Sequence, residues 1–244
     1  MLHTPNTTHI TLPNLRFFDF GGVSAYLEVL LSHINAPLLK RLGAIFFNQL
    51  SFSVPHLSQF VTTAENIRFN SVDFLFCHKA VVVFMYFSLN AWFPTIEIRV
   101  DCDHLDWQVS SMAQILNVLS PLFSTVVDLT LDYRSHTLSS DWHNQADHSQ
   151  WRELLGSFRN VQTLRVHDGL AGELYRCLSS DGESPSEILP ELKRLVCPMG
   201  SRDNESFSRF VHDREVVGLP IYLTEDVFPT GYEFETAAGV EYVS

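Results

Sequence analysis

The segment Val126-Val-Asp-Leu-Thr-Leu131 carries the pattern on which the expected fold depends. Its apolar-x-x-apolar-x-apolar positions are Val126, Leu129 and Leu131, and the polar residues Asp128 and Thr130 flank Leu129. Because successive side chains of a β-strand point to opposite faces, Leu129 and Leu131 share one face and Asp128 lies on the other. The segment therefore predicts a strand with one buried face and one face in water.

The same spacing, apolar-x-x-apolar-x-apolar, recurs along the chain. The copies begin at Leu15, Leu39, Ala64, Phe93, Val126, Val161 and Leu192, at intervals of 24 to 35 residues. Such an interval accommodates one strand and one helix, and a stack of three or more units buries a continuous core. The sequence thus predicts seven stacked strand-and-helix units.

Segments with helical spacing lie between the copies. Their apolar faces consist of Val23, Leu27, Leu30, Leu31 and Ile34; Val109, Met112, Leu116 and Leu119; Trp151, Leu154, Leu155 and Phe158; Leu170, Leu174 and Leu178; and Phe207, Phe210, Val211 and Val217. Strands that alternate with helices favour a parallel sheet. With one polar sheet face, the expected fold is an α/β leucine-rich-repeat-like solenoid, an open arc with parallel strands on the concave face and helices on the convex face.

The expected domain organisation is one irregular repeat domain over 1–225, followed by a C-terminal tail over 226–244. Beyond Glu225 the chain is aromatic and acidic without periodicity. We expect this tail to be poorly ordered, or docked by Phe228, Tyr232 and Phe234.

Composition excludes several classes of protein. Hydrophobic residues make up 45% of the 244 residues and aromatic residues 12%, which is typical of a globular chain. The net charge of −12 disfavours a nucleic-acid partner, because such partners need a basic surface. The longest apolar run, from Ala80 to Leu89, is about half the ~20 residues of a membrane-spanning helix, so it predicts a buried strand and no membrane partner.

The compartment is predicted from two further features. The four cysteines form no C-x-x-C pair, and the first residues after Met1 lack the basic and apolar regions of a secretory signal. We therefore expect an intracellular protein of the cytoplasm or nucleus.

No motif predicts an enzyme, a cofactor or a metal site. Asp101-Cys-Asp-His-Leu-Asp106 has metal-ligating residue types, but its place between a strand and a helix favours a turn with Asp caps. A second group, His136, Asp141, His143, Asp147 and His148, lacks a rigid zinc-binding spacing and is interpreted as a solvated loop. Gly21-Gly22 opens a helix without a phosphate-binding signature, which favours a strand-to-helix turn.

The candidate binding residues are charged side chains that alternate with the buried positions. They are Asp19, Arg41, Arg68, Glu97, Arg99, Asp128, Asp132, Arg165 and His167. Mixed charges on a concave sheet suit a protein partner through electrostatic complementarity, and they are equally compatible with a plain solvated face.

Five stretches resemble a known family: Leu12-Pro-Asn-Leu-Arg-Phe-Phe18, Ala36-Pro-Leu-Leu-Lys-Arg-Leu42, Thr125-Val-Val-Asp-Leu-Thr-Leu131, Phe158-Arg-Asn-Val-Gln-Thr-Leu-Arg-Val166 and Leu189-Pro-Glu-Leu-Lys-Arg-Leu195. They are similar to the divergent leucine-rich-repeat portion of the F-box-type proteins of mushroom-forming fungi, over roughly residues 10–225. The resemblance implies the substrate-recognition arm of a cullin-type ubiquitin ligase. The chain departs from the family in lacking a recognisable F-box, since Leu189-Pro-Glu-Leu192 leads directly into the last repeat.

The function expected from the sequence is therefore a non-enzymatic protein-interaction scaffold that binds a protein substrate of unknown identity. A ligase adaptor would be a partner only if a longer form carries an F-box. Two alternatives stay open, a hydrolase that uses the His- and Asp-rich loops and a degenerate copy without a partner.

Overall fold

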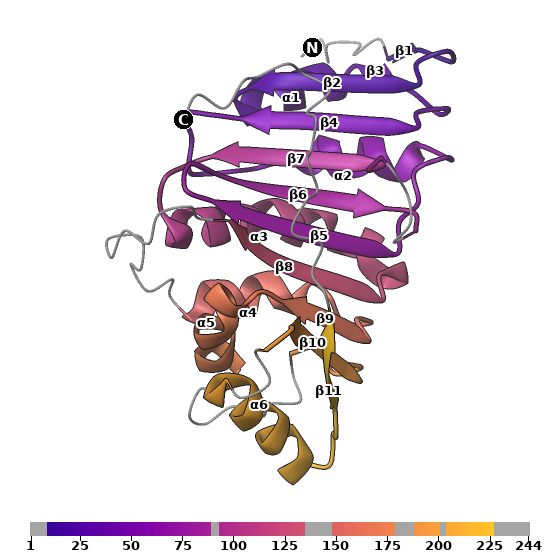
Figure 1. Cartoon of the computed structure of the whole chain (residues 1–244). Helices are drawn as coiled ribbons and strands as arrows, with labels where there is room; N and C mark the ends of the chain where they lie inside the picture. Colours follow the sequence, from indigo (N-terminus) through magenta and orange to yellow (C-terminus); the bar gives the residue numbers. More distant parts are fainter. Residues whose placement is uncertain (1–8, 89–92, 135–147, 179–187, 201–203, 227–244) are drawn as a thin grey trace, which may run out of the picture.

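The structure is a computed structural model, and it describes residues 9–88, 93–134, 148–178, 188–200 and 204–226. Within these residues, nine strands form one mixed sheet in the order β11-β10-β9-β8-β5-β6-β7-β4-β2 (Figure 1). The strands of this sheet are β2 (Phe17–Gly22), β4 (Arg41–Phe46), β5 (Ser71–Cys77), β6 (Ala80–Tyr86), β7 (Ile96–Asp101), β8 (Asp128–Arg134), β9 (Thr163–Val166), β10 (Arg194–Pro198) and β11 (Tyr222–Asp226). Strand β6 is antiparallel to both of its neighbours, and the other pairs are parallel.

The helices of the described residues cover one face of this sheet, as Figure 1 shows. They are α1 (Ser24–Leu31), α2 (Pro55–Thr63), α3 (Leu105–Leu119), α4 (His148–Gly156), α5 (Asp168–Leu178) and α6 (Glu205–Val216), with the 3-10 helix η1 (Ser120–Thr125) after α3. A separate two-stranded sheet pairs β1 (Ile10–Thr11) with β3 (Ile34–Asn35).

The predicted leucine-rich-repeat arc is wrong. In a solenoid each strand pairs with the next strand along the chain, but the neighbour of β4 is β7. The chain passes from β4 through α2 to β5, three places along the sheet, and β6 and β7 then fill the gap. The physical reason is the two-residue connection His78–Lys79, which joins β5 and β6 as an antiparallel hairpin.

Six of the seven predicted strand cores are strands. The patterns that begin at Leu15, Leu39, Phe93, Val126, Val161 and Leu192 lead into β2, β4, β7, β8, β9 and β10. The pattern at Ala64 is not a strand, since it lies in the loop between α2 and β5. Ala64 and Phe69 are buried there, so the spacing reflects their packing in a loop.

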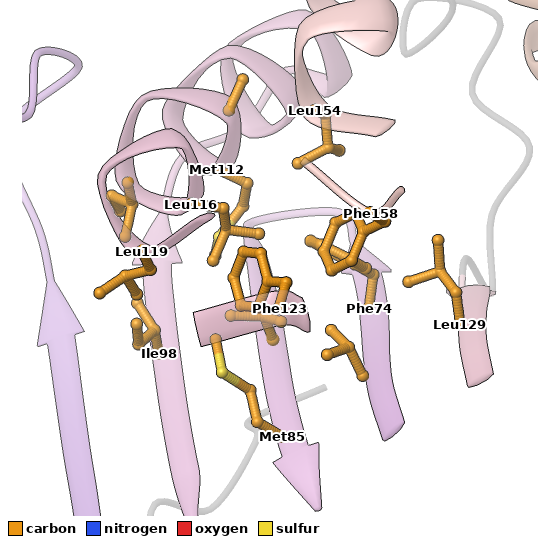
Figure 2. Close-up of a cluster of buried hydrophobic side chains, with 14 of the residues drawn as sticks. Phe74, Met85, Ile98, Met112, Leu116, Leu119, Phe123, Leu129, Leu154 and Phe158 are labelled. Atoms are coloured by element: carbon orange, nitrogen blue, oxygen red, sulfur yellow. The ribbon is translucent and has the colours of Figure 1, made fainter. Parts of the chain in front are cut away.

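The main core fills the space between the helices and the covered face of the sheet. Figure 2 shows Phe74 of β5, Met85 of β6 and Ile98 of β7 among side chains from α3, η1 and the region of α4. The rings of Phe123 and Phe158 stack with centroids 4.8 Å apart. The apolar helix faces predicted from the sequence contribute to this core at Met112, Leu116 and Leu119 and at Leu154.

Several further predictions from the sequence can be compared with the structure one by one. Of the run from Ala80 to Leu89 predicted as a buried strand, Ala80–Tyr86 form β6 and are all buried, whereas Phe87 is 65% exposed. No helix in the described ranges is long and apolar enough to cross a membrane. Cys77, Cys102 and Cys197 keep their thiols and are not joined to one another by disulfide bonds. Of the expected tail, Asp226 ends β11 and 227–244 lie outside the described residues.

Candidate binding face of the sheet

The open face is defined here as the face of the nine-stranded sheet opposite the helices (Figure 1). On β8, Leu129 and Leu131 point into the main core and are fully buried. The alternation of strand side chains therefore places Asp128, Thr130 and Asp132 on the open face. The same alternation assigns residues of every strand from β2 to β10 to this face.

Seven of the nine predicted binding residues lie on the open face. They are Asp19, Arg41, Glu97, Arg99, Asp128, Asp132 and Arg165, at alternate positions of β2, β4, β7, β8 and β9. In register, Asp19 lies beside Gly43, and Gly43 lies beside Glu97. A Cβ at position 43 would come 2.2 Å from an Asp19 carboxylate oxygen, so glycine there leaves the room that Asp19 occupies.

Two of the nine predicted residues do not belong to this face. Arg68 is exposed in the loop between α2 and β5, because the pattern that suggested a strand there is a loop. His167 follows β9, its ring lies edge-on to that of Tyr133, and its Nδ1 is 3.3 Å from the backbone N of Gly169. His167 thus packs at the start of α5.

Ion pairs organise the open face. Arg41 of β4 donates to Glu97 of β7 at 3.1 Å, and Arg165 of β9 lies 3.4 Å from Asp128 of β8. Within β7, Arg99 donates to Asp101 at 2.6 Å. The sequence predicted charges of both signs on this face, but their pairing follows from the register of neighbouring strands, which the sequence did not reveal.

Between these pairs lies the apolar strip, defined as Leu75 of β5 with Val82, Phe84 and Tyr86 of β6. Val82 and Phe84 are 7% exposed and Tyr86 is 9% exposed, although they point away from the main core. Sequence reasoning missed this strip as a site. The signal was present, because an uninterrupted apolar run predicts a strand that is covered on both faces.

Two polar residues of β5, Asp73 and Ser71, lie beside the apolar strip. In register, Asp73 of β5 lies between Phe84 of β6 and Thr130 of β8. Burial raises the pKa of Asp73 to about 6, against the opposing effects of a hydrogen bond from Thr130 and the charge of Arg165. The Oδ1 atom of Asp73 and the Oγ atom of Ser71 are buried and have no hydrogen-bond partner among the described residues.

The segment from Asp101 to Asp106 forms the strand-to-helix connection that the sequence predicts, but without an Asp cap. The N-cap of α3 is His104, and its side chain makes no capping hydrogen bond. Burial, with the neighbouring carboxylates Asp101, Asp103 and Asp106, raises the pKa of the Cys102 thiol to about 12. A thiol with this pKa is almost fully protonated at neutral pH and is a poor nucleophile.

Metal ligation finds no support within the part of the chain that the structure describes, where no three His, Cys, Asp or Glu side chains group as ligands. Of the second predicted group, His136, Asp141, His143 and Asp147 lie outside the described residues, and His148 is the first residue of α4. The predicted loop there is therefore untested over most of its length.

Fold and site define a class of two-layer α/β protein whose mixed sheet has one helix-covered face and one open face. No protein-family model, no curated protein and no solved structure matches this chain. The resemblance to F-box-type proteins stays a prediction, and the parallel arc that it implied is replaced by the mixed sheet.

Proposed function

We propose that this chain is a non-enzymatic protein-interaction scaffold and that the open face is its binding surface. The observation that supports the proposal is the presence of two partly exposed ion pairs on the open face, one on each side of the buried apolar strip. Arg41–Glu97 lies on one side, towards β4, and Arg165–Asp128 lies on the other, towards β9. A polar rim that stays accessible to solvent is part of the usual anatomy of a protein-binding surface.

The ion pairs give this surface a fixed charge pattern. Arg41 and Glu97 are each about one quarter exposed, so both reach solvent while neighbouring strands hold them in place. A pre-positioned guanidinium loses less side-chain entropy when it meets a partner carboxylate. Complementary charges of this kind supply specificity and a faster association rate more than raw affinity.

The proposal does not include a place in a ubiquitin ligase, because that expectation depended on an arc of parallel repeats. The hydrolase alternative stays a prediction that rests on the His- and Asp-rich loop, most of which lies outside the described residues. The high pKa of Cys102 argues against that thiol as its nucleophile.

A charge-swap experiment tests the scaffold. Arg41→Glu combined with Glu97→Arg keeps the ion pair and reverses its direction across the open face. A matched control is Glu205→Arg combined with Arg209→Glu, which swaps an exposed ion pair within α6, on the helix side of the molecule. Wild type and both variants are used for quantitative affinity capture in cells of the source organism.

The expected result is a set of proteins captured equally by wild type and the α6 control and lost with the β4–β7 swap. Loss is expected because the swap places like charges against a surface matched to the original pattern. Capture that is the same for all three chains, or no reproducible capture by wild type, would contradict the proposal. Thermal unfolding of each variant shows that all three remain folded.

A further inference from the structure

We propose that two copies of this chain associate through the outer side of α1, at one end of the helix layer, and form a two-fold symmetric dimer. The surface concerned, called here the end surface, consists of Ile10 of β1 with Tyr26, Val29 and Leu30 of α1. Figure 1 shows β1, α1 and β2 together at this end of the molecule.

The end surface is apolar and open to solvent. Its side chains are exposed by about two fifths to three quarters: Leu30 by 42%, Ile10 by 57%, Val29 by 63% and Tyr26 by 73%. The three residues of α1 have the spacing i, i+3 and i+4, so they lie side by side on the helix. The inner side of α1 is apolar as well, because Leu27 and Leu31 are buried in the main core. A surface helix normally carries polar residues on its outer side, so α1 has the composition of a helix that is covered on both sides.

The outer side of α1 points away from the other helices. Glu28 shows where the neighbouring helix lies, because its carboxylate accepts hydrogen bonds from the backbone N of His56 at 2.7 Å and of Leu57 at 2.9 Å, in the first turn of α2. With 3.6 residues per turn, Tyr26 and Leu30 each lie about 160° around the helix axis from Glu28. They therefore occupy the side against which a further helix would pack if the row of helices continued.

The helix at the opposite end of the layer, α6, has a polar outer side (Figure 1). Up to Glu215 its exposed residues are Glu205, Ser208, Arg209, His212 and Glu215, and Glu205 forms an ion pair with Arg209. In stacked arrays of structural units, the terminal unit needs a polar outer face to remain in solution. The outer side of α6 meets this requirement and that of α1 does not, so α1 requires a cover.

The distribution of charge favours a second copy of the chain as this cover. The chain has a net charge of −12, so contact between two copies brings like charges together over most of the surface. Residues 9–39, in contrast, hold one basic and two acidic residues, Arg16, Asp19 and Glu28, for a net charge of −1. The Glu28 carboxylate already binds the start of α2. Two copies can therefore meet at the end surface without repulsion, whereas a charged partner would find no charge there to complement its own.

The size of the end surface suits a weak dimer. An aromatic side chain offers about 150–250 Å² and an aliphatic one about 60–120 Å². At their exposed fractions, the four side chains supply about 200–400 Å² per copy, and exposed Ala25 and His33 lie beside them on the same helix. Interfaces below about 1,200 Å² in total belong to transient complexes, and two-fold contacts between identical surfaces are the commonest kind. We therefore expect a dissociation constant in the micromolar range.

A dimer joined at this end would present two open faces. A partner with two binding segments would then bind the dimer more tightly than a single chain, because its second contact forms within the complex. This gain rests on the proposed function, whereas the dimer itself does not. The test uses the protein without any partner, so the outcomes for the dimer and for the scaffold are separate.

The first experiment measures association of the full chain by analytical ultracentrifugation, from sub-micromolar to sub-millimolar concentration. Val29→Glu places a carboxylate of each copy in the interface. The matched control is Val216→Glu at the end of α6, because Val216 is at least as exposed as Val29 and lies at the opposite end of the layer. Tyr26→Glu serves as a second interface variant, and circular dichroism during thermal unfolding shows that each variant is folded.

Wild type and Val216→Glu should form the same concentration-dependent dimer. Val29→Glu should raise its dissociation constant by roughly tenfold or more, because like charges then oppose each other across the two-fold axis. Tyr26→Glu should have an effect in the same direction. The proposal is wrong if wild type stays monomeric throughout this range, or if the two valine variants weaken the dimer equally or not at all.

The second experiment locates the contact by photo-cross-linking. Benzoylphenylalanine replaces Tyr26, and in the control it replaces Tyr222 of β11, which is at least as exposed. Mixing isotopically labelled with unlabelled chains identifies cross-links between copies by mass spectrometry. Position 26 should cross-link to α1 or β1 of the second copy, and position 222 should give no cross-link between copies. A cross-link from position 26 only within its own chain, or to another surface of the second copy, would overturn the proposal.

Discussion

The C-terminal half of the sheet, from β8 to β11, differs from its centre, from β5 to β7, in the relation between sequence and space. In the C-terminal half each strand lies beside the next strand of the chain, with α4, α5 and α6 between them. In the centre, the β5–β6 hairpin and two long crossovers through α2 and α3 give a different order. Both regions contribute to the same main core.

The difference teaches how the two faces of a strand are used. On β9, Leu164 is fully buried in the core while Thr163 and Arg165 are half-buried on the open face. On β6, every residue is buried, whichever face it points to. Strand β6 at the centre therefore buries side chains on both of its faces, whereas β9 buries them on one.

The largest expected effect is a loss of stability caused by a substitution in the core that both regions share. Leu129→Asp should unfold the protein, because removing a buried Leu costs about 2–5 kcal/mol and an unpaired buried charge adds several more. Total stabilities of about 5–15 kcal/mol leave little margin for such a loss. Far-UV circular dichroism during thermal unfolding measures the effect, and Thr163→Asn on the open face is the control. A melting temperature equal to that of wild type would show that the position of Leu129 in the core is wrong.

The next prediction compares an outward-pointing residue that is buried, on β6, with one that is exposed, on β10. Phe84→Ala on the open face of β6 should destabilise the protein by about 3 kcal/mol, because the ring is as buried as a core side chain. Arg194→Ala, on the open face of β10, should change the unfolding free energy by less than about 0.5 kcal/mol, because Arg194 is exposed. Chemical denaturation compares the two variants. Equal costs would remove the distinction between the two regions.

A third prediction concerns pH and the centre of the open face. Because burial raises the pKa of Asp73 from its ordinary 3.8 to about 6, the folded state holds the proton at pH values where the unfolded state has lost it. This group therefore lowers the free energy of unfolding as the pH rises from about 4 to 6.

Asp73→Asn should accordingly be more stable than wild type at pH 7, by up to about 3 kcal/mol, and equally stable below the ordinary pKa of the carboxyl. Denaturation at several pH values measures the difference. The gain should persist in high salt, because desolvation is its main cause and salt screens only the contributions of neighbouring charges. A variant that is less stable than wild type at pH 7 would contradict the assigned burial of Asp73.

The smallest expected effect compares ion pairs on the two sides of the molecule. Glu97→Gln removes the charge that pairs with half-buried Arg41 and should cost up to about 1 kcal/mol. Glu205→Gln, which acts on the exposed pair with Arg209 in α6, should cost no more than about 0.5 kcal/mol. Denaturation at low and at high salt resolves the difference, and an equal cost for both would show that the sheet does not hold Arg41 in place.

Local pattern was sufficient to predict most elements of the C-terminal half. Leu129 and Leu131 alternate with Asp128, Thr130 and Asp132, so one strand and its buried face follow from local spacing alone. The regular succession of strand and helix there also makes chain neighbours into sheet neighbours. Asp128 and Arg165 were therefore placed on the correct face without knowledge of the structure.

The centre of the sheet could not be predicted in the same way. The run Ala80–Tyr86 indicated a buried strand, but nothing local states that Ile96 of β7 pairs with Leu42 of β4. The pattern at Ala64 has the spacing of a strand because residues of this loop are also buried in the core. This wrong prediction placed Arg68 on the sheet. The apolar strip was missed although Val82, Phe84 and Tyr86 alternate along one strand, and only Leu75 joins them through the β5–β6 register.

The pairing of β4 with β7 has a consequence for synthesis of the chain on the ribosome. Leu42 of β4 must wait for Ile96 of β7 to emerge, which takes several seconds at about 5–20 residues per second. At the end of that interval the apolar run of β6 has been made, and its partner β7 has not. A nascent chain of this protein therefore presents its most aggregation-prone segment before the strand that protects it exists, and we expect ribosome-associated chaperones to act in that interval.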